Sequence, residues 1–207
     1  MKLLKQFFFL GLTLVLMSSC AKIFYSPDAN SLATKQKIIA IVPPSVSIAA
    51  SKKITAEAMI EQQKTESVNF QKEIYSWLLK RKMQGKMIQE IQELETTNAK
   101  LKKAGYPETP LTTEELCEVL GVDGIMTSTF GLSKPMSEGA AIAIAVLFGA
   151  GAATNEVHAS LSISDCSAKK LIWNYDHKFS GGVGSNPARL VDGLMRNASK
   201  RMPYIIQ

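Results

Sequence analysis

Hydrophobic and polar residues follow two different periods along the chain. Apolar, β-branched runs predict strands at residues 37–42 and 125–130, and strict alternation of apolar and polar positions predicts two more at 156–164 and 170–179. Only the polar segment 165–169 separates the last two, so we expect them to form a β-hairpin.

Apolar residues spaced three and four apart predict helices between and after these strands. Residues 56–105 are helical in character, and Gly85 predicts a turn between two helices; a continuous coiled coil is the alternative, but two heptads are too few to support it. A short helix is expected at 111–120, with capping-box spacing at its start. Asn186 as N-cap, followed by proline, predicts a closing helix over 188–202.

The order of these elements predicts the fold class. Strands and helices that follow one another in this order along the chain favour an α+β fold, in which helices pack on one small mixed β-sheet. The first and last helices are expected to bury one apolar face each. These faces are Phe70, Ile74, Trp77, Leu78 and Arg81 in the first helix, and Leu190, Val191, Leu194 and Ala198 in the last.

The first twenty residues carry an export signal. Two lysines are followed by an apolar segment, 7–17, which is too short to span about 30 Å of hydrocarbon and has the length of a secretory h-region. The run Met17-Ser18-Ser19-Cys20 resembles the lipobox of bacterial lipoproteins. The resemblance implies cleavage before Cys20 and palmitate-type acyl chains on it, and several such chains anchor a protein stably. The alternative is an ordinary signal peptide that is cut nearby.

An anchored chain of this kind is expected in the outer membrane, facing the periplasm. Ala21 and Lys22 follow the cysteine, so neither the aspartate that retains many proteobacterial lipoproteins in the inner membrane nor an acidic export run is present. We therefore expect a lipoprotein signal peptide over 1–19, a lipidated tether over 20–36, and a single α+β domain over 37–207.

Composition and charge limit the kinds of molecule that the chain is expected to bind. The 207 residues carry a net charge of +6. Of these residues 46% are hydrophobic and 20% are charged, and this composition excludes a wholly disordered chain. A basic chain can bind nucleic acid, but an exported and anchored chain meets none. The basic clusters at 80–86 and 100–103 are therefore interpreted as solvated helix faces, or as contacts for acidic lipid head groups or an acidic partner.

The segment 139–153 consists of small or apolar residues without a charge. It is too short for a conventional spanning helix. It is either a buried core element or an insert that touches the membrane or mediates self-association, because small residues let two backbones approach closely. The residues expected to make such contacts are Ala141, Ile142, Ile144, Val146, Leu147 and Phe148.

The strands of the domain carry a family resemblance. The run LGVDG at 120–124 precedes a predicted strand, and Asp165 precedes the turn that leads into LIW at 171–173. Over residues 37–202 the pattern resembles the lipoproteins related to the curli secretion channel, and it is similar to the amino-terminal domain of the Tol translocation protein. The resemblance implies an α+β envelope lipoprotein. The channel subunit inserts a membrane hairpin where 139–153 lies here, but a spanning hairpin needs about 9–11 residues per strand.

No sequence motif assembles a catalytic site or implies a cofactor. Nucleophile elbows, phosphate-binding loops and zinc-protease motifs are absent. His158 and His177 lie on separate strands of the hairpin without a Cys, Asp or Glu at metal-ligand spacing. Cys117 and Cys166 either pair in an oxidising periplasm or remain buried thiols.

These observations favour a non-enzymatic docking or assembly module in outer-membrane transport or secretion. It is expected to bind membrane lipid through Cys20, to bind other envelope proteins, and to self-associate. One alternative is a subunit of an oligomeric outer-membrane secretion pore. The other is a hydrolase with an unrecognised site.

Overall fold

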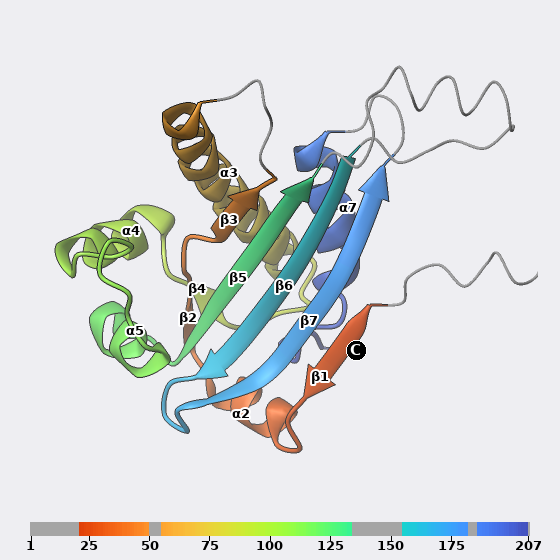
Figure 1. The fold of residues 1–207 in the computed structure, drawn as a ribbon. Helices are drawn as coiled ribbons and strands as arrows, with labels where there is room; N and C mark the ends of the chain where they lie inside the picture. Colours follow the sequence, from red (N-terminus) through yellow and green to blue (C-terminus); the bar gives the residue numbers. More distant parts are fainter. Residues whose placement is uncertain (1–20, 50–54, 134–154, 182–185, 207) are drawn as a thin grey trace, which may run out of the picture.

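The computed structural model describes residues 21–49, 55–133, 155–181 and 186–206. Over this part of the chain, helices pack on a seven-stranded mixed sheet in the order β1-β7-β6-β5-β2-β4, and β3 also pairs with β5 (Figure 1). The predicted α+β fold is confirmed. The strands are β1 (Lys22–Tyr25), β2 (Ile38–Ile41), β3 (Ser45–Ile48), β4 (Glu90–Ile91), β5 (Gly124–Ser133), β6 (Asn155–Asp165) and β7 (Lys170–Gly181); the helices are α2 (Ala29–Lys35), α3 (Ala56–Met83), α4 (Leu94–Lys103), α5 (Thr113–Leu120) and α7 (Pro187–Ala198).

Three long antiparallel strands, β5, β6 and β7, form the centre of the sheet. The predicted hairpin is confirmed as β6 and β7. On the side away from β6, β5 pairs with two short parallel strands, first β2 and then β3. Pro43 and Pro44 lie between these two strands. At the end of β5, Ser133 lies opposite Glu156 of β6, so the connection between the two strands leaves and returns at one end of the sheet.

The main hydrophobic core lies between the sheet and helices α3 and α7, which cover one of its faces (Figure 1). The apolar face predicted for α3 is confirmed, because Phe70, Ile74, Trp77 and Leu78 are all buried. The ring of Phe70 lies 4.8 Å from the ring of Phe130 on β5. Alternation along the strand places Met126, Phe130 and Leu132 of β5 on this face.

Helix α7 begins as predicted and ends four residues early. Asn186 caps it by accepting a hydrogen bond from the Arg189 amide at 3.0 Å, and proline stands at the start. The predicted inward face is buried, but the helix ends at Ala198 instead of continuing to residue 202. The buried Arg81 of α3 donates to Ser199 Oγ at 3.0 Å and thereby links the ends of the two helices.

A second, smaller core lies on the opposite face at one end of the sheet. Helices α4 and α5 cover Ala40 of β2 and Ile125 of β5, which are register partners. Helix α5 has the predicted capping box, in which Thr112 and Glu115 exchange hydrogen bonds. Gly121 ends this helix in the left-handed conformation, with φ of 62°, where glycine is favoured.

A disulfide joins this second core to the hairpin. Cys117 of α5 and Cys166, in the turn between β6 and β7, are bonded and are separated by 49 residues in the sequence. Two further contacts hold the same parts together. The Cys166 amide donates to the Asp123 carbonyl at 2.9 Å, and Lys169 forms a 3.0 Å ion pair with Glu114.

The tether predicted for residues 20–36 is wrong over its described part. Lys22–Tyr25 forms strand β1, which pairs with β7, and Ala29–Lys35 forms helix α2. Ala29 and Ala33 of that helix lie four residues apart and are buried in the main core. Both elements are too short to show a period in the sequence. Pairing with the long strand β7 stabilises β1, and burial of Ala29 and Ala33 in the core stabilises α2.

Two other short strands were also missed. Residues 45–48, which lie between the strand and the helix predicted from the sequence, form β3, because β5 continues to Ser133 and offers its edge there. Residues 86–93, expected to be helical, are extended and contain β4, and the second helix begins only at Leu94. The Gln92 amide donates to the Ile39 carbonyl at 2.8 Å, so the edge of β2 replaces helical hydrogen bonds.

One face assignment on β7 is also corrected. Alternation along residues 170–179 predicts Leu171 on the same face as Trp173, but Leu171 is 41% exposed and Ile172 is fully buried. Ile163 and Ser164 of β6 pair with Trp173 and Leu171, so Ile172 of β7 is an extra residue that forms a β-bulge. A bulge reverses the face on which the residues on either side of it alternate.

A buried polar network lies beneath the hairpin turn. Gln36 Nε2 donates to Asp165 Oδ2 at 2.7 Å, and the Tyr204 hydroxyl donates to Gln36 Oε1 at 2.5 Å. Asp165 Oδ1 also accepts from the Ala168 amide and the Ser167 hydroxyl, each at 2.7 Å. Burial alone would raise the pKa of Asp165, but these hydrogen bonds outweigh it and hold the pKa below its ordinary value.

Substitution of Asp165 by Asn is expected to lower the free energy of unfolding by about 2 kcal/mol at neutral pH. The amide would turn a donor toward another donor, Gln36 Nε2. Because the folded pKa is depressed, the carboxylate stabilises the fold above the ordinary pKa of aspartate, about 4, and this contribution disappears as the pH falls through the folded pKa. Urea unfolding of wild type and D165N at pH 7 and pH 3 measures it. A difference between the two proteins that is equally large at both pH values would contradict this account.

Candidate functional site

The two sites predicted from sequence lie outside the described residues. These are the lipidation residue Cys20 and the insert Ala141, Ile142, Ile144, Val146, Leu147 and Phe148. The structure does show where both join the fold. Ala21 leads directly into β1, and the segment with the insert connects the paired residues Ser133 of β5 and Glu156 of β6.

The strand that follows Cys20 forms an edge of the sheet. Within the described residues β1 pairs with β7 alone, with Lys22 opposite Asp176 and Tyr25 opposite Trp173. Phe24 is 49% exposed and Tyr25 is 45% exposed, so two neighbouring aromatic side chains are half open to solvent. This edge therefore presents apolar rings to the surroundings.

Two basic residues from the end of the chain lie beside this edge. The Tyr25 hydroxyl donates to the Arg201 carbonyl, although 176 residues separate them in the sequence. Lys200 and Arg201 are exposed, and so is Lys22 at the start of β1. We refer to these five residues as the β1 edge surface: Lys22, Phe24, Tyr25, Lys200 and Arg201.

A cleft of about 900 Å³ lies next to the β1 edge surface. Tyr25, Lys200 and Arg201 line it, together with the exposed side chains of Ile88 and Ile206. No Asp or Glu is among its lining residues, so its charged groups are all positive. The cleft therefore favours an anionic or apolar ligand over a cationic one.

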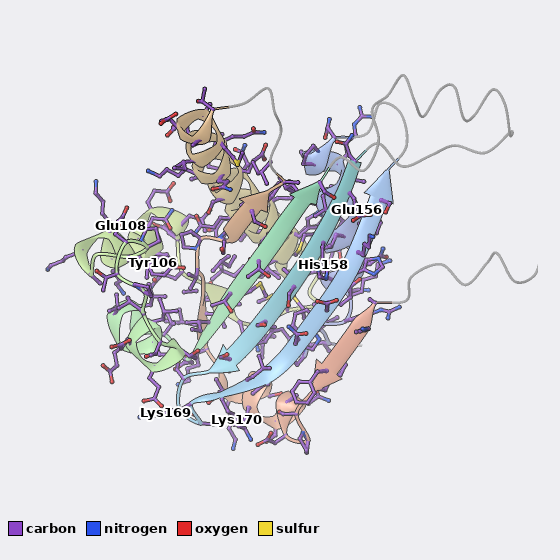
Figure 2. All side chains as sticks on the ribbon, viewed as in Figure 1. Tyr106, Glu108, Glu156, His158, Lys169 and Lys170 are labelled. Atoms are coloured by element: carbon purple, nitrogen blue, oxygen red, sulfur yellow. A yellow bond between two sulfur atoms is a disulfide. The ribbon has the colours of Figure 1, made fainter. Side chains whose placement is uncertain are left out.

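The sheet face away from α3 and α7 is polar. Figure 2 shows Glu156 and His158 on this face of β6. Hydroxyl groups from β5 and β6, including Thr129 and Ser160, line a shallow cavity of about 180 Å³ together with Tyr106. His158 Nε2 lies 3.2 Å from Asp176 Oδ2, and both side chains are open to solvent.

The structure separates the two histidines. His158 lies opposite Lys178 on the polar face, whereas His177 lies opposite Ala159 on the core face, between the rings of Tyr175 and Phe179. Burial lowers the pKa of His177 below its ordinary value. Over the described ranges, no three His, Cys, Asp or Glu side chains gather as a metal site would require.

None of the described helices is long and apolar enough to cross a membrane.

The basic residues of the cluster at 80–86 differ in their surroundings. Lys80 and Lys82 are at the surface, where Lys82 pairs with Glu90, but Arg81 is buried against α7. The basic groups of the first cluster are therefore not one solvated face.

Sequence reasoning missed the β1 edge surface. The run KIFY at 22–25 was the available signal, because two aromatic residues and an isoleucine in four positions are typical of a strand. Its neighbours Lys200 and Arg201 could not be found in the same way, since only the tertiary fold brings them to β1.

The chain was compared with known proteins. No family model matches it, and no curated protein matches it. Among solved structures it is similar to a PelC dodecamer from Paraburkholderia phytofirmans, with 9% identity and a TM-score of 0.49, over 91% of this chain and 99% of that one. Lipoprotein GNA1162 from Neisseria meningitidis shows 14% identity and a TM-score of 0.47, over 80% of this chain and 96% of that one.

A third similar structure is the LpoB C-terminal domain from Salmonella enterica. It shows 10% identity and a TM-score of 0.34, over 74% of this chain and 95% of that one. Identities and TM-scores this low do not transfer a function.

Proposed function

We propose that this chain is a lipid-anchored lipoprotein of the bacterial cell envelope, whose folded domain binds other envelope components. The observation that carries the proposal is the run Met17-Ser18-Ser19-Cys20 after an apolar segment of signal-peptide length. Cleavage before Cys20 would leave an acylated cysteine two positions before the first strand. Without an aspartate after the cysteine, the outer membrane is the proposed location, with the domain facing the periplasm.

The proposed activity is docking, not catalysis. Within the described residues the histidine–carboxylate pair His158 and Asp176 is solvated, and the buried polar groups Gln36, Asp165 and Tyr204 bond to one another. Each of these groups therefore has a structural or surface role already. The β1 edge surface and the adjoining cleft present exposed rings and positive charges that a partner could contact.

A pore subunit is the second candidate, and one observation favours it. The apolar segment 139–153 belongs to the connection between β5 and β6, which are paired neighbours with Ser133 opposite Glu156. A connection between two paired antiparallel strands is the place where a membrane hairpin would extend a sheet. Discrete single-channel conductance from the purified protein in a lipid bilayer would favour this candidate, and a silent bilayer would remove it.

Palmitate labelling tests the lipid anchor. We expect cells that express the wild-type chain to incorporate radiolabelled palmitate into it, and C20S to incorporate none and to keep its signal peptide, because the acylated sulfur is lost. S18A is the matched control, since it keeps a small residue in the signal and should be labelled like wild type. A C20S protein that is processed and sorted as before would overturn the proposal.

The same cells test the docking activity. Crosslinking before lysis is expected to join the wild-type protein to other envelope proteins, and identification of the adducts gives the partners. A strictly monomeric protein without envelope adducts would contradict a docking role, even if palmitate is incorporated.

A further inference from the structure

The distance between the proposed lipid and the folded domain is short. Only Ala21 stands between Cys20 and Lys22, the first residue of β1. Two residues of fully extended chain span about 7 Å. If Cys20 carries the lipid, as the proposed function holds, the start of β1 cannot move farther than this from the acylated residue. The edge of the sheet, not a free tether, then meets the membrane first.

The chemistry of this edge suits a bilayer interface. Phe24 lies opposite Asn174 and Tyr25 lies opposite Trp173, so the two exposed rings project from opposite faces of the same edge strand. Aromatic side chains of this kind concentrate where hydrocarbon meets head groups. A membrane that contacts the edge can therefore meet both rings at once.

The charges of the edge match an anionic head-group layer. Lys22 lies on the Phe24 side of the strand, and Lys200 and Arg201 lie on the Tyr25 side. The neighbouring acids are Asp176 and Asp28. Asp176 lies opposite Lys22, with its carboxylate 3.2 Å from His158, and Asp28 forms an ion pair with Lys170. Basic residues attract anionic lipids within about 10 Å of the surface.

The cleft next to the β1 edge surface has the same combination of exposed apolar and basic groups. Of its lining residues, Tyr25, Ile88 and Ile206 are large exposed hydrophobic residues, and its charged groups, Lys200 and Arg201, are both positive. Exposed apolar groups next to cations are the combination that a phospholipid surface satisfies, because acyl chains and phosphates lie within a few ångströms of each other.

We propose that the β1 edge surface lies against the anionic head groups of the membrane that holds Cys20, so that the β-sheet stands edge-on to the bilayer. The anchor and this surface then act together. The lipid supplies attachment, and Phe24, Tyr25 and the three basic residues fix the orientation of the domain. The polar sheet face and the helical face are left accessible to partners.

Fluorescence quenching in reconstituted vesicles tests the proposal. The full lipidated chain carrying F24W is placed in phosphatidylethanolamine and phosphatidylglycerol vesicles whose acyl chains are brominated. The native Trp77 and Trp173 are 7% and 0% exposed, so the new indole is the accessible one. We expect the added emission to fall at least twofold relative to non-brominated vesicles.

I60W is the matched control. Ile60 is 52% exposed and lies in the first turns of α3, away from the β1 edge surface. Its added emission should change by less than a fifth. A second comparison tests the charges: K22Q/R201Q/K200Q should lose at least half of the F24W quenching, whereas the exposed lysines of K64Q/K102Q/K103Q should leave it unchanged.

The outcomes separate this inference from the proposed function. Protein that floats with the vesicles, but whose F24W is quenched no more than I60W, overturns the edge-on orientation and leaves the lipid anchor standing. Protein that carries no palmitate and does not float removes the proposed function itself. A blue shift of F24W that depends on protein concentration and not on brominated lipid would assign the edge to a second copy of the chain and would also overturn the inference.

Discussion

Reduction of the Cys117–Cys166 disulfide is expected to lower the free energy of unfolding by about 4 kcal/mol. The bond closes a loop of 49 residues of sequence separation, and in the chain-entropy description most of its effect comes from restricting the unfolded chain. The folded state should persist after reduction. The Lys169–Glu114 ion pair and the hydrogen bond from the Cys166 amide to Asp123 still join α5 to the hairpin turn.

Denaturant unfolding with and without a reducing agent measures this effect. The C117A/C166A variant should match the reduced protein, and a reducing agent should not change its unfolding midpoint. The comparison is made in a C20S background, so that no other thiol takes part. Equal midpoints for oxidised and reduced protein would contradict the prediction.

Substitution of Gly124 by Ala is expected to cost about 3 kcal/mol of folding stability, at the upper end for overpacking of a core. A Cβ atom at this position would lie 2.2 Å from Gln36 Oε1 and 2.7 Å from its Cδ. Gln36 cannot easily move away, because it is 3% exposed and its amide is bonded to both Asp165 and Tyr204. The added methyl group would therefore break the buried network as well as crowd it.

G131A is the matched control, since Gly131 lies on the same strand. A Cβ atom there would come no nearer than 3.6 Å to Ser47 Oγ, which is ordinary van der Waals contact, so we expect a change of less than about 1 kcal/mol. Thermal or urea unfolding of both variants gives the comparison. Equal stability losses in G124A and G131A would show that the contact with Gln36 is not the cause.

The long elements of the fold could be predicted from the sequence because their signals are local. Helix α3 repeats its apolar face over several turns, and the alternation along β6, and along β7 after its bulge, shows which residues face the core. The capping box of Thr112 and Glu115 also lies within four residues. Each of these signals is complete within one stretch of chain, so no tertiary information is needed to see it.

The short edge strands could not be predicted because their stability comes from their partners. β1, β3 and β4 have four, four and two residues, and each depends on a longer or more buried strand for its hydrogen bonds. The same limit applies to the surface. Tyr25 meets Arg201 across 176 residues, and Cys117 meets Cys166 across 49. Only the arrangement of the whole sheet brings these residues together.

The short distance between Cys20 and β1 has a mechanical consequence. A lipidated chain has no slack at this point, so any tension between the membrane and a partner bound to the domain passes into β1. Four residue pairs, from Lys22 opposite Asp176 to Tyr25 opposite Trp173, then carry the load into β7. A pull normal to the bilayer would separate these pairs one after another, beginning at Lys22. Strand β1 would therefore detach from the sheet before the rest of the domain unfolds.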